Sequence, residues 1–335
     1  MAPKVLIFGT GSIGGAYAVI LSRAVPAADI TVICRSNFEA VAENGITLHS
    51  SLPAWGRDLN VKPSVARTVA DAVEASKGAP FDYILVTSKA VSTTPSTPEL
   101  IQPAVTPKTT IVLIQNGINI EAPFATMFPD NPILSTVVYL PATQVQPGII
   151  EHSEVELLHI GTYPAQAPAA HKDAAHAFAD LLTRAGASSK LHDDVQAERW
   201  SKLLVNASWN SICALTRGRD RQLLEVDTQS GDFAGFVRSV MLEIAATAQA
   251  YGYTGVNEAL VDLQLKRATS RQLPGIQPSM MADALAGRNM EVDAIIGNTV
   301  TLAREKGISI PMLQTIYFLA AGLDRSFSLA RSLHS

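Results

Sequence analysis

The sequence predicts an α/β domain built on a doubly wound parallel sheet, followed by an all-α domain, and three observations favour this fold class. A strand, a glycine turn and a helix fill the first 24 residues, and a strand at 30–33 completes a βαβ unit. The later strands of the first half are continuously apolar, which is typical of strands buried on both faces of a parallel sheet. Only helical periodicity continues after about residue 193. We therefore expect one domain over 1–193 and a second over 194–335.

The individual elements follow from the same patterns. In the first domain we expect strands at 5–8, 30–33, 83–86, 110–114, 132–140 and 155–160, a loop at 163–170 and an amphipathic helix at 171–186. In the second domain we expect helices at 195–215, 232–251, 257–270 and 291–306, and a last helix from about 311. No strand is expected after residue 193.

Composition limits the class of protein. The 335 residues are 47% hydrophobic and 17% charged, with a formal net charge of −4, so the chain can bury a large core and lacks the bulk positive charge of many nucleic-acid surfaces. The cysteines, Cys34 and Cys213, are too few for a disulfide framework or a Cys-based zinc ribbon, and they fit a reducing compartment. The first residues do not have the pattern of a secretory signal and no apolar run reaches about 18 residues, so we expect neither a signal peptide nor a membrane span. We expect a cytoplasmic protein with no metal site.

A glycine-rich turn follows the first strand. In a GxGxxG turn the first glycine permits the tight bend, the second lets a pyrophosphate approach the backbone, and the third lets the helix pack on the strand. The N-terminus of the helix then attracts the phosphates. The strand before this turn and the helix after it favour a Rossmann-type dinucleotide site over an ordinary glycine-rich turn. The residues expected to bind the cofactor here are Gly9, Thr10, Gly11, Ser12, Ile13 and Gly14.

The end of the second strand indicates which dinucleotide binds. NAD sites usually carry Asp or Glu there to hold the ribose hydroxyls, but here the strand ends in Arg35 and Ser36. A guanidinium group offers forked donors to a 2′-phosphate, and the serine hydroxyl can add another. NADP(H) is therefore favoured over NAD(H). The alternative is that Arg35 is a solvated surface residue.

Two more loops follow apolar strands at the edge of the sheet where ligands bind in such folds. Lys89 follows the strand at 83–86, and Asn116 follows the strand at 110–114. Each side chain could reach the cofactor or a substrate oxyanion. Judged by its local sequence alone, each residue is more often part of a turn.

The second domain carries a polar stripe. Lys202, Asn206 and Asn210 are spaced i, i+4, i+8, so a helix places them on one face among apolar neighbours. A lysine and two amides on a buried helix need polar partners, which are either one another or a polar ligand. Further on, Ser279 can start a helix and Glu291 falls in the first turn of another, and helix capping accounts for both as well as a ligand does.

Together these motifs resemble the ketopantoate reductase (2-dehydropantoate 2-reductase) family over nearly the whole chain. The resemblance implies a Rossmann domain followed by a helical domain, with the active site in the cleft between them. It also implies NADPH-dependent reduction of a 2-oxo acid, with conversion of ketopantoate to pantoate in pantothenate biosynthesis as the first choice. The segments that carry the resemblance are 9–14, 88–90, 115–117, 200–206 with Asn210, and 278–280 with Glu291.

The resemblance implies substrate-side roles for several residues. Lys202 corresponds to the catalytic lysine of the family, which polarises the ketone and acts as general acid. Asn206 and Asn210 correspond to amides that hold the substrate, and Ser279 corresponds to a serine that contacts its carboxylate.

It implies cofactor-side roles for three more. Glu291 corresponds to an acid near the nicotinamide ribose that helps to close the cleft. Lys89 and Asn116 correspond to cofactor contacts, with Asn116 near the reacting carbonyl. Catalytic roles are therefore expected for Lys202, Glu291 and Asn116.

Two departures from the family pattern bear on the substrate. Ser211 stands where the family usually has proline after the second asparagine, and Asp220 replaces a substrate-side asparagine. An ionised aspartate only accepts hydrogen bonds, and it repels a substrate carboxylate unless an arginine neutralises it. We expect Asp220 to pair with Arg217, Arg219 or Arg221 and to face away from the cleft. The alternative is that it faces the cleft and selects a substrate with an extra donor.

Two rival functions stay open beside reduction of ketopantoate. One is an NADPH-dependent reductase of another 2-oxo or β-keto acid, and the other is a non-catalytic NADP-binding sensor. The presence of Lys202, Asn206 and Glu291 argues against a sensor, which needs no proton donor. The expected partner is a small-molecule 2-oxo acid, with no nucleic acid and no membrane, and a homodimer is left open.

Overall fold

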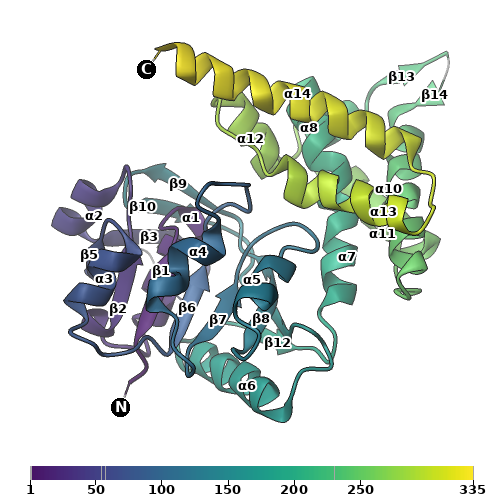
Figure 1. Cartoon of the computed structure of the whole chain (residues 1–335). Helices are drawn as coiled ribbons and strands as arrows, with labels where there is room; N and C mark the ends of the chain where they lie inside the picture. Colours follow the sequence, from purple (N-terminus) through teal and green to yellow (C-terminus); the bar gives the residue numbers. More distant parts are fainter. Residues whose placement is uncertain (1, 54, 57, 230, 335) are drawn as a thin grey trace. The chain divides into compact units, whose positions relative to one another are not determined.

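The computed structural model describes residues 2–53, 55–56, 58–229 and 231–334. The chain divides into two compact units, whose elements are labelled in Figure 1. The first unit comprises Met1–Lys89, Thr93–Gln115 and Glu121–Val195. The second comprises Gln196–Ser335 together with two short segments from the first half, Ala90–Ser92 and Asn116–Ile120. Two loops that follow strands of the sheet therefore belong to the helical unit.

The first unit is built on an eight-stranded sheet, counted over the described residues, with the order β12-β11-β8-β7-β6-β1-β2-β5. Neighbouring strands are parallel except β8 and β11, which are antiparallel. The chain leaves β1 toward β2 on one side and later returns to β6 on the other, which is the switch point where ligands bind in doubly wound folds. This topology confirms the predicted fold class. The strands are β1 (Val5–Phe8), β2 (Ile30–Ile33), β5 (Ser64–Ala66), β6 (Tyr83–Val86), β7 (Thr110–Leu113), β8 (Ile133–Tyr139), β11 (Leu157–Thr162) and β12 (Ser189–Leu191).

A second sheet, which the sequence did not reveal, packs on helix α1 (Ser12–Leu21). Its strands are β3 (Ile46–Ser50), β4 (Leu59–Val61), β9 (Ala142–Gln146) and β10 (Ile149–His152). A Cβ on Gly15 would lie 2.4 Å from the side chain of Ile150, so α1 and this sheet are in close contact. Because α1 is covered on several sides, its residues from Gly14 to Leu21 are all buried, and the glycine turn before it has a fixed base.

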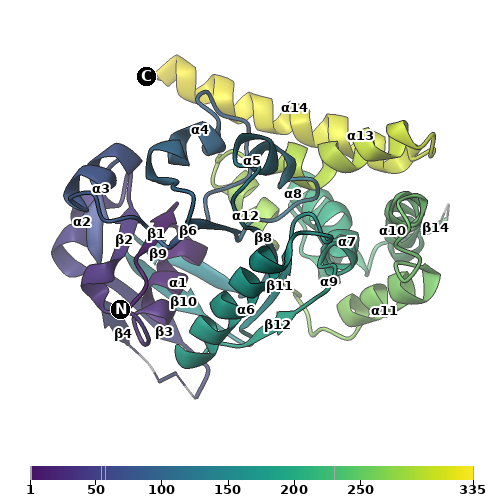
Figure 2. The ribbon, with the colours of Figure 1, turned by 60° about the horizontal axis from the view of Figure 1, so that its bottom comes forward.

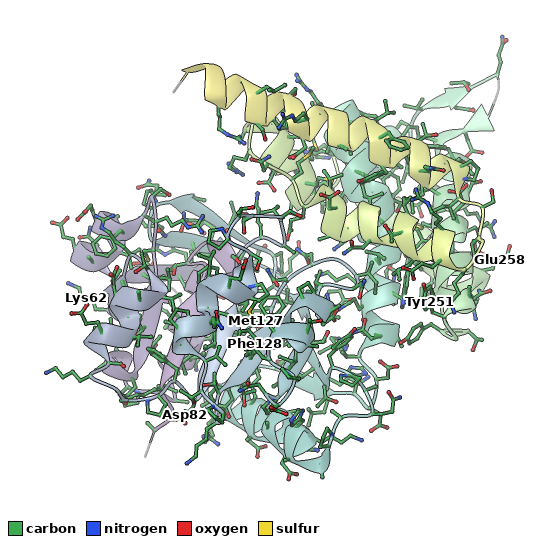
Figure 3. The ribbon with its side chains drawn as sticks, viewed as in Figure 1. Lys62, Asp82, Met127, Phe128, Tyr251 and Glu258 are labelled. Carbon is green, nitrogen blue, oxygen red and sulfur yellow. The ribbon has the colours of Figure 1, made fainter. Side chains whose placement is uncertain are left out.

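Helices complete the first unit (Figures 1 and 2). Helix α6 contacts α1, β11 and β12, and its buried Phe178 and Leu182 join the core beneath the sheet. The carboxylate of Asp82, at the surface in Figure 3, accepts from Lys4 N at 2.8 Å and so ties the start of β6 to the start of β1. The helices are α2 (Phe38–Asn44), α3 (Val69–Ala75), α4 (Thr97–Ile101), α5 (Ala122–Met127) and α6 (Ala169–Arg184), with short 3₁₀ turns at Ala27–Asp29 and Gln102–Ala104.

The second unit is helical, as predicted, and two of its expected helices contain π-helical turns. The helix expected at 195–215 is α7 (Gln196–Val205), a π turn (Asn206–Asn210) and α8 (Ser211–Thr216). The helix expected at 291–306 is a π turn (Asp293–Gly297) followed by α13 (Asn298–Glu305). The others are α9 (Asp220–Leu223), α10 (Phe233–Ala250), α11 (Glu258–Thr269), α12 (Ser279–Leu285) and α14 (Pro311–His334).

The expectation of no strand after residue 193 is wrong in one place. Strands β13 (Asp227–Thr228) and β14 (Gly231–Asp232) pair as a small antiparallel hairpin before α10. Two residues are too few to produce an alternating pattern, so the sequence offers no periodic signal for them.

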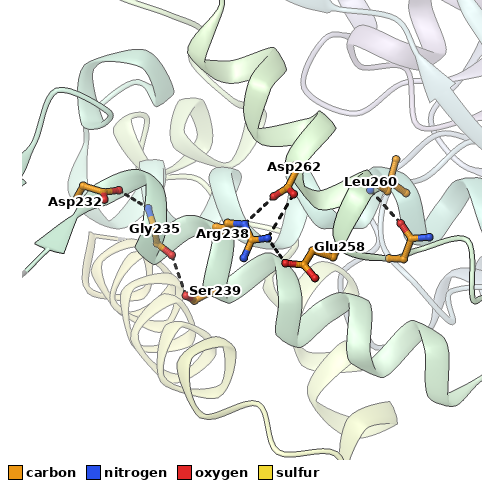
Figure 4. Close-up of polar contacts among 8 residues, drawn as sticks. Asp232, Gly235, Arg238, Ser239, Glu258, Leu260 and Asp262 are labelled. Carbon is orange, nitrogen blue, oxygen red and sulfur yellow. Dashed lines mark hydrogen bonds and ion pairs between the residues drawn. The ribbon is translucent and has the colours of Figure 1, made fainter.

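Local side-chain contacts set the starts and the pairing of α10 and α11 (Figure 4). Asp232 caps α10 by accepting from Gly235 N, and Asn257 caps α11 by accepting from Leu260 N at 3.2 Å. Between the helices, Arg238 donates to Asp262 at 2.7 Å and also pairs with Glu258. These ion pairs are exposed, so solvent screens them and they add little to stability. No helix in the described part of the chain combines the length and apolar character that crossing a bilayer requires.

Candidate active site

The three glycines of the turn between β1 and α1 have different surroundings. Gly9 has a φ of +105°, which favours glycine, and a Cβ there would lie 2.4 Å from Ser88 N. A Cβ on Gly14 would lie 2.3 Å from Gly9 O, so this glycine is needed for packing. Gly11 differs, because no atom lies within 4 Å of the position of its Cβ. A side chain at Gly11 would therefore fill the cradle that a pyrophosphate needs at the N-terminus of α1, and the turn fits such a group.

Neighbouring strands hold the polar side chains of this turn. The Thr10 hydroxyl donates to Ile33 O at 2.8 Å, and the Asn37 amide donates to Thr10 O at 2.6 Å. The Ser12 hydroxyl accepts from Gln144 N in β9 at 2.8 Å. These bonds support the loop, so the turn offers a ligand mainly its backbone N–H groups.

Arg35 lies exposed just after β2, where the sequence analysis expects the 2′-phosphate of NADP(H). The structure places a second arginine beside it. Arg67 follows β5, the strand paired with β2, and its guanidinium carbon lies 3.9 Å from the centroid of the Phe38 ring while its nitrogens pair with Glu39. The Phe38 N–H donates to Arg35 O at 3.2 Å, so both arginines adjoin the same turn. Sequence reasoning missed Arg67 because the three-residue β5 has no recognisable pattern.

The second unit brings Lys202, Asn116 and Glu291 together. Lys202 Nζ donates to Asn116 Oδ1 at 3.1 Å, and Asn116 Nδ2 lies 3.4 Å from Glu291 Oε2. The other oxygen of Glu291 accepts from Ala90 N at 2.9 Å. These contacts form one chain of polar groups drawn from four distant segments. Lys89 is exposed and directly precedes the Ala90 amide.

The loop that carries Asn116 is anchored on helices of the same unit. Gly117 has a φ of +104°, and a Cβ there would lie 2.4 Å from Ala294 O, so only glycine fits this close approach. Ile118 N donates to the same Ala294 oxygen at 3.0 Å, and Arg199 Nη1 donates to Gly117 O at 2.9 Å. Since Arg199 lies one turn before Lys202 on α7, the helix that supplies the lysine also fixes the loop that supplies its partner.

Burial alters the protonation of Lys202. The pKa of this lysine is lowered from 10.5 to about 8, because loss of solvation and the nearby Arg199 outweigh the opposing effects of Glu291 and Glu198. An ammonium group with a pKa near 8 is protonated at neutral pH and still gives up its proton readily. The residues around Lys202 therefore suit it to act as a general acid.

Asn206 and Asn210 lie in the π turn that interrupts the α7–α8 helix. In a regular α-helix each four-residue step advances about 40° around the axis, so a stripe at i, i+4, i+8 drifts sideways. The wider π turn reduces this drift for Asn210, which is buried, and keeps it closer to the line of Lys202 and Asn206. The Ser211 hydroxyl donates to Ala207 O at 2.7 Å, and so bonds to a carbonyl inside the π turn.

Ser279 is the first residue of α12 and is exposed, with Pro278 in the N-cap position. The loop that leads to it is tied to Asp220, and here the expected pairing is wrong. Asp220 is fully buried, Arg271 is its ion-pair partner, and its Oδ1 accepts from Ile276 N at 2.8 Å.

The backbone N–H of Arg221 donates to Asp220 Oδ1 at 2.7 Å, but the side chains of the neighbouring arginines make other contacts. Arg219 donates to Gly275 O at 3.3 Å and Arg221 pairs with Glu225, while Arg217 is exposed. The physical reason is that Asp220 begins α9 with its side chain turned into the core, where adjacent residues cannot follow. Asp220 is therefore a structural carboxylate that fixes the 271–276 loop. In the described part of the chain, no group of three or more His, Cys, Asp or Glu side chains is arranged to hold a metal ion.

The fold and the similar proteins are those of oxidoreductases that act on CH–OH groups. The family model described as ketopantoate reductase PanE/ApbA matches residues 5–165, and its C-terminal counterpart matches residues 194–324. The chain belongs to the ketopantoate reductase family.

Individual relatives span the whole chain. A 2-dehydropantoate 2-reductase of Nostoc sp. is 26% identical over 96% of this chain and 95% of the relative. The crystal structure of 2-dehydropantoate 2-reductase from Methylococcus capsulatus is 32% identical, has a TM-score of 0.81 and covers 97% of both chains. D-mandelate dehydrogenase, in a ternary structure with NADH and anilino(oxo)acetate, has a TM-score of 0.82 over 97% of this chain and 99% of its own. Its identity is 18%, so that likeness is one of fold.

Proposed function

We propose that the protein is an NADPH-dependent reductase of a 2-oxo acid, with ketopantoate as its substrate and pantoate as its product. The observation that carries this proposal is the hydrogen bond of 3.1 Å from Lys202 to Asn116, made by a lysine whose surroundings lower its pKa to about 8. A sensor that only bound a dinucleotide would have no use for an ammonium group held in this way.

Lys202 is the general acid of the proposed reaction. The hydride for the keto carbon would come from NADPH when it is bound. As negative charge develops on the keto oxygen, Lys202 stabilises it and donates a proton to it, which leaves a hydroxyl group on the product and a neutral lysine. Asn116 aims the ammonium group by accepting one of its hydrogens.

Glu291 keeps this arrangement in order. Its two oxygens accept from Ala90 N and Asn116 Nδ2, so the Asn116 amide is oriented with its oxygen toward Lys202. The negative charge of Glu291 also keeps the ammonium form of Lys202 populated. We assign the substrate contacts to Asn206, Asn210 and Ser279, whose amides and hydroxyl can donate to the carboxylate and hydroxyl oxygens of a 2-oxo acid.

We assign cofactor binding to a domain of residues 1–193, and the substrate and catalytic groups to residues 194–335 with Asn116. The glycine turn would hold the pyrophosphate through backbone N–H groups. Arg35 would bind the 2′-phosphate, Arg67 would add a second positive charge beside it, and Lys89 would contact the cofactor.

Transfer of isotope tests the proposed chemistry. NADPH that carries deuterium at the transferable C4 position is incubated with the protein and ketopantoate, and the product is analysed by mass spectrometry and NMR. We expect pantoate with one deuterium on C2. Oxidation of the cofactor without deuterium in the product would contradict hydride transfer to the keto carbon.

A further inference from the structure

The turn that precedes Glu291 is held by the C-terminal half of α14. Asp324 accepts from Met290 N at 2.6 Å through one oxygen and from the Asn289 amide at 3.0 Å through the other. The Ser328 hydroxyl lies 2.9 Å from the same Asn289 nitrogen. Arg331 donates to Gly287 O at 2.6 Å and also to the side-chain oxygen of Asn289. Three side chains of one helix therefore bind a single four-residue turn.

The three side chains lie on one face of the helix and share one partner. Asp324, Ser328 and Arg331 are spaced i, i+4, i+7, so they lie on one face of α14. The turn itself, 287–290, has no helix or strand of its own, and Asn289 bonds to all three side chains. The Gly287–Arg288 end of the turn is also bonded to α12, where Asp283 accepts from Arg288 Nε at 3.1 Å and from Arg288 N at 2.9 Å. The end nearest Glu291 is held by the α14 side chains and by the burial of Met290.

The set extends past the region matched by the C-terminal family model. That model ends at residue 324, so Asp324 is its last matched residue, and Ser328 and Arg331 lie beyond it.

We propose that Asp324, Ser328 and Arg331 are positioning residues that hold the 287–290 turn so that the Glu291 carboxylate stays between Ala90 N and Asn116. Glu291 follows Met290 directly, so a shift of the turn moves the start of the π turn and the carboxylate with it. The predicted effect on turnover rests on the proposed function, whereas the predicted effect on Lys202 does not.

Lys202 reports the position of Glu291 without any need for turnover. The charged groups that act on this lysine are Arg199, which lowers its pKa, and Glu291 and Glu198, which raise it. If the turn loosens, Glu291 moves away from Asn116 and its effect on Lys202 weakens. The pKa of Lys202 then falls below its value of about 8 in the intact protein.

The experiment measures the rate at which acetic anhydride acylates Lys202 as a function of pH, with the modified peptide quantified by mass spectrometry. Asn289→Ala is the principal variant, because it removes the shared partner of all three side chains without a change of charge. Glu291→Gln sets the size of the effect that loss of the carboxylate charge produces. We expect Asn289→Ala to lower the pKa of Lys202 in the same direction, and we expect the double variant to match Glu291→Gln alone.

Arg331→Ala and Arg325→Ala form a matched pair on the same helix. Both remove one exposed arginine, but only Arg331 contacts the turn. We expect Arg331→Ala to lower the pKa of Lys202 and Arg325→Ala to leave it unchanged. If Asn289→Ala does not fold, Ser328→Ala removes a single bond and serves in its place.

Turnover is measured separately on the same variants. We expect kcat to fall roughly 10- to 100-fold in Asn289→Ala, as for a displaced catalytic group, with a smaller change in the NADPH KM. The proposal is overturned if Asn289→Ala and Arg331→Ala leave the pKa of Lys202 unchanged while Glu291→Gln shifts it. An absence of reductase activity in the parent protein would contradict the proposed function and leave this result to stand by itself.

Discussion

Lys202 Nζ lies 3.1 Å from Asn116 Oδ1, although 86 residues separate the two in the sequence. A lysine ammonium can only donate, so the amide oxygen must face it and the amide nitrogen must face elsewhere. Glu291 satisfies that nitrogen and accepts from Ala90 N as well. The donor and acceptor of each hydrogen bond in this chain of groups are thereby fixed. Lys202 is the donor at one end, and Glu291 is the acceptor at the other.

Removal of the lysine should stop chemistry and spare cofactor binding. We expect Lys202→Ala to lower kcat by roughly 10²- to 10⁴-fold, the usual range for a positioned acid. NADPH binding, measured by fluorescence titration, should survive, because the glycine turn and Arg35 belong to the other unit. A collapse of cofactor affinity would mean that Lys202 is structural and that the proton comes from another group.

The pH dependence of kcat should follow the protonation of Lys202. A general acid works only while it holds its proton, so kcat should be constant at neutral pH and should decrease as pH rises through about 8. Glu291→Gln removes a charge that favours the ammonium form, so the decrease should begin at a lower pH in that variant. A profile that stays flat well above this value, or one that moves upward in Glu291→Gln, would contradict the assignment.

Arg35 should set the preference for NADPH over NADH. We expect Arg35→Ala to raise the NADPH KM by roughly 10- to 100-fold, from the loss of a charge-assisted contact worth about 1.5–3 kcal/mol, with little change for NADH. Arg67→Ala should act in the same direction with a smaller effect, because Arg67 is also engaged by Phe38 and Glu39. Lys62→Ala, at an exposed site of the same unit, is the control. An equal loss with both cofactors would refute the role of Arg35.

Asp220 should contribute more to stability than a carboxylate in a surface ion pair would. Considered as a surface pair, the carboxylate would contribute under about 1 kcal/mol. It is instead fully buried against Arg271 and Ile276 N, so Asp220→Asn should lower the free energy of unfolding by about 1–3 kcal/mol, measured in urea. The substrate KM should rise as the loop before Ser279 loosens, with a smaller change in kcat.

A double-mutant cycle checks the origin of that loss. If Asp220 and Arg271 are coupled as the structure has them, the effects of Asp220→Asn and Arg271→Gln should be less than additive. Additive effects would contradict the coupling of Asp220 to Arg271. A gain of 10-fold or more in kcat/KM for ketopantoate in Asp220→Asn would point to a carboxylate that faces the substrate.

The sequence was sufficient for the features that depend on local pattern. The strand and glycine turn before α1, the buried parallel strands and the long helices of the second unit all have periodic signals, and the structure has them within a few residues. The spacing of Lys202, Asn206 and Asn210 also singled out one helix. The second sheet was missed because its strands are short and because it joins distant segments, since β10 pairs with β3 across about a hundred residues.

Other features of the site depend on contacts between distant segments, which the sequence could not show. Nothing near Asp220 indicates that its partner is Arg271, because pairing depends on how α9 and the 271–276 loop pack. The π turn at 206–210 has no sequence pattern that distinguishes it from an α-helix. The sequence showed only that Ser211 stands where the family usually has proline. The inclusion of Ala90 and Asn116 in the helical unit follows from hydrogen bonds to Glu291 and Lys202, which no local pattern predicts.

The central claim is that the protein reduces a 2-oxo acid with NADPH, and the most direct measurement is cofactor oxidation with a panel of 2-oxo and β-keto acids. The panel is run with NADPH and with NADH, on the parent protein and on Lys202→Ala. We predict that ketopantoate gives the highest kcat/KM in the panel, that NADPH is preferred, and that Lys202→Ala is slow with every acid. Tight NADPH binding without oxidation by any acid would contradict the account and indicate a sensor, and a clear preference for a different acid would replace ketopantoate as the substrate.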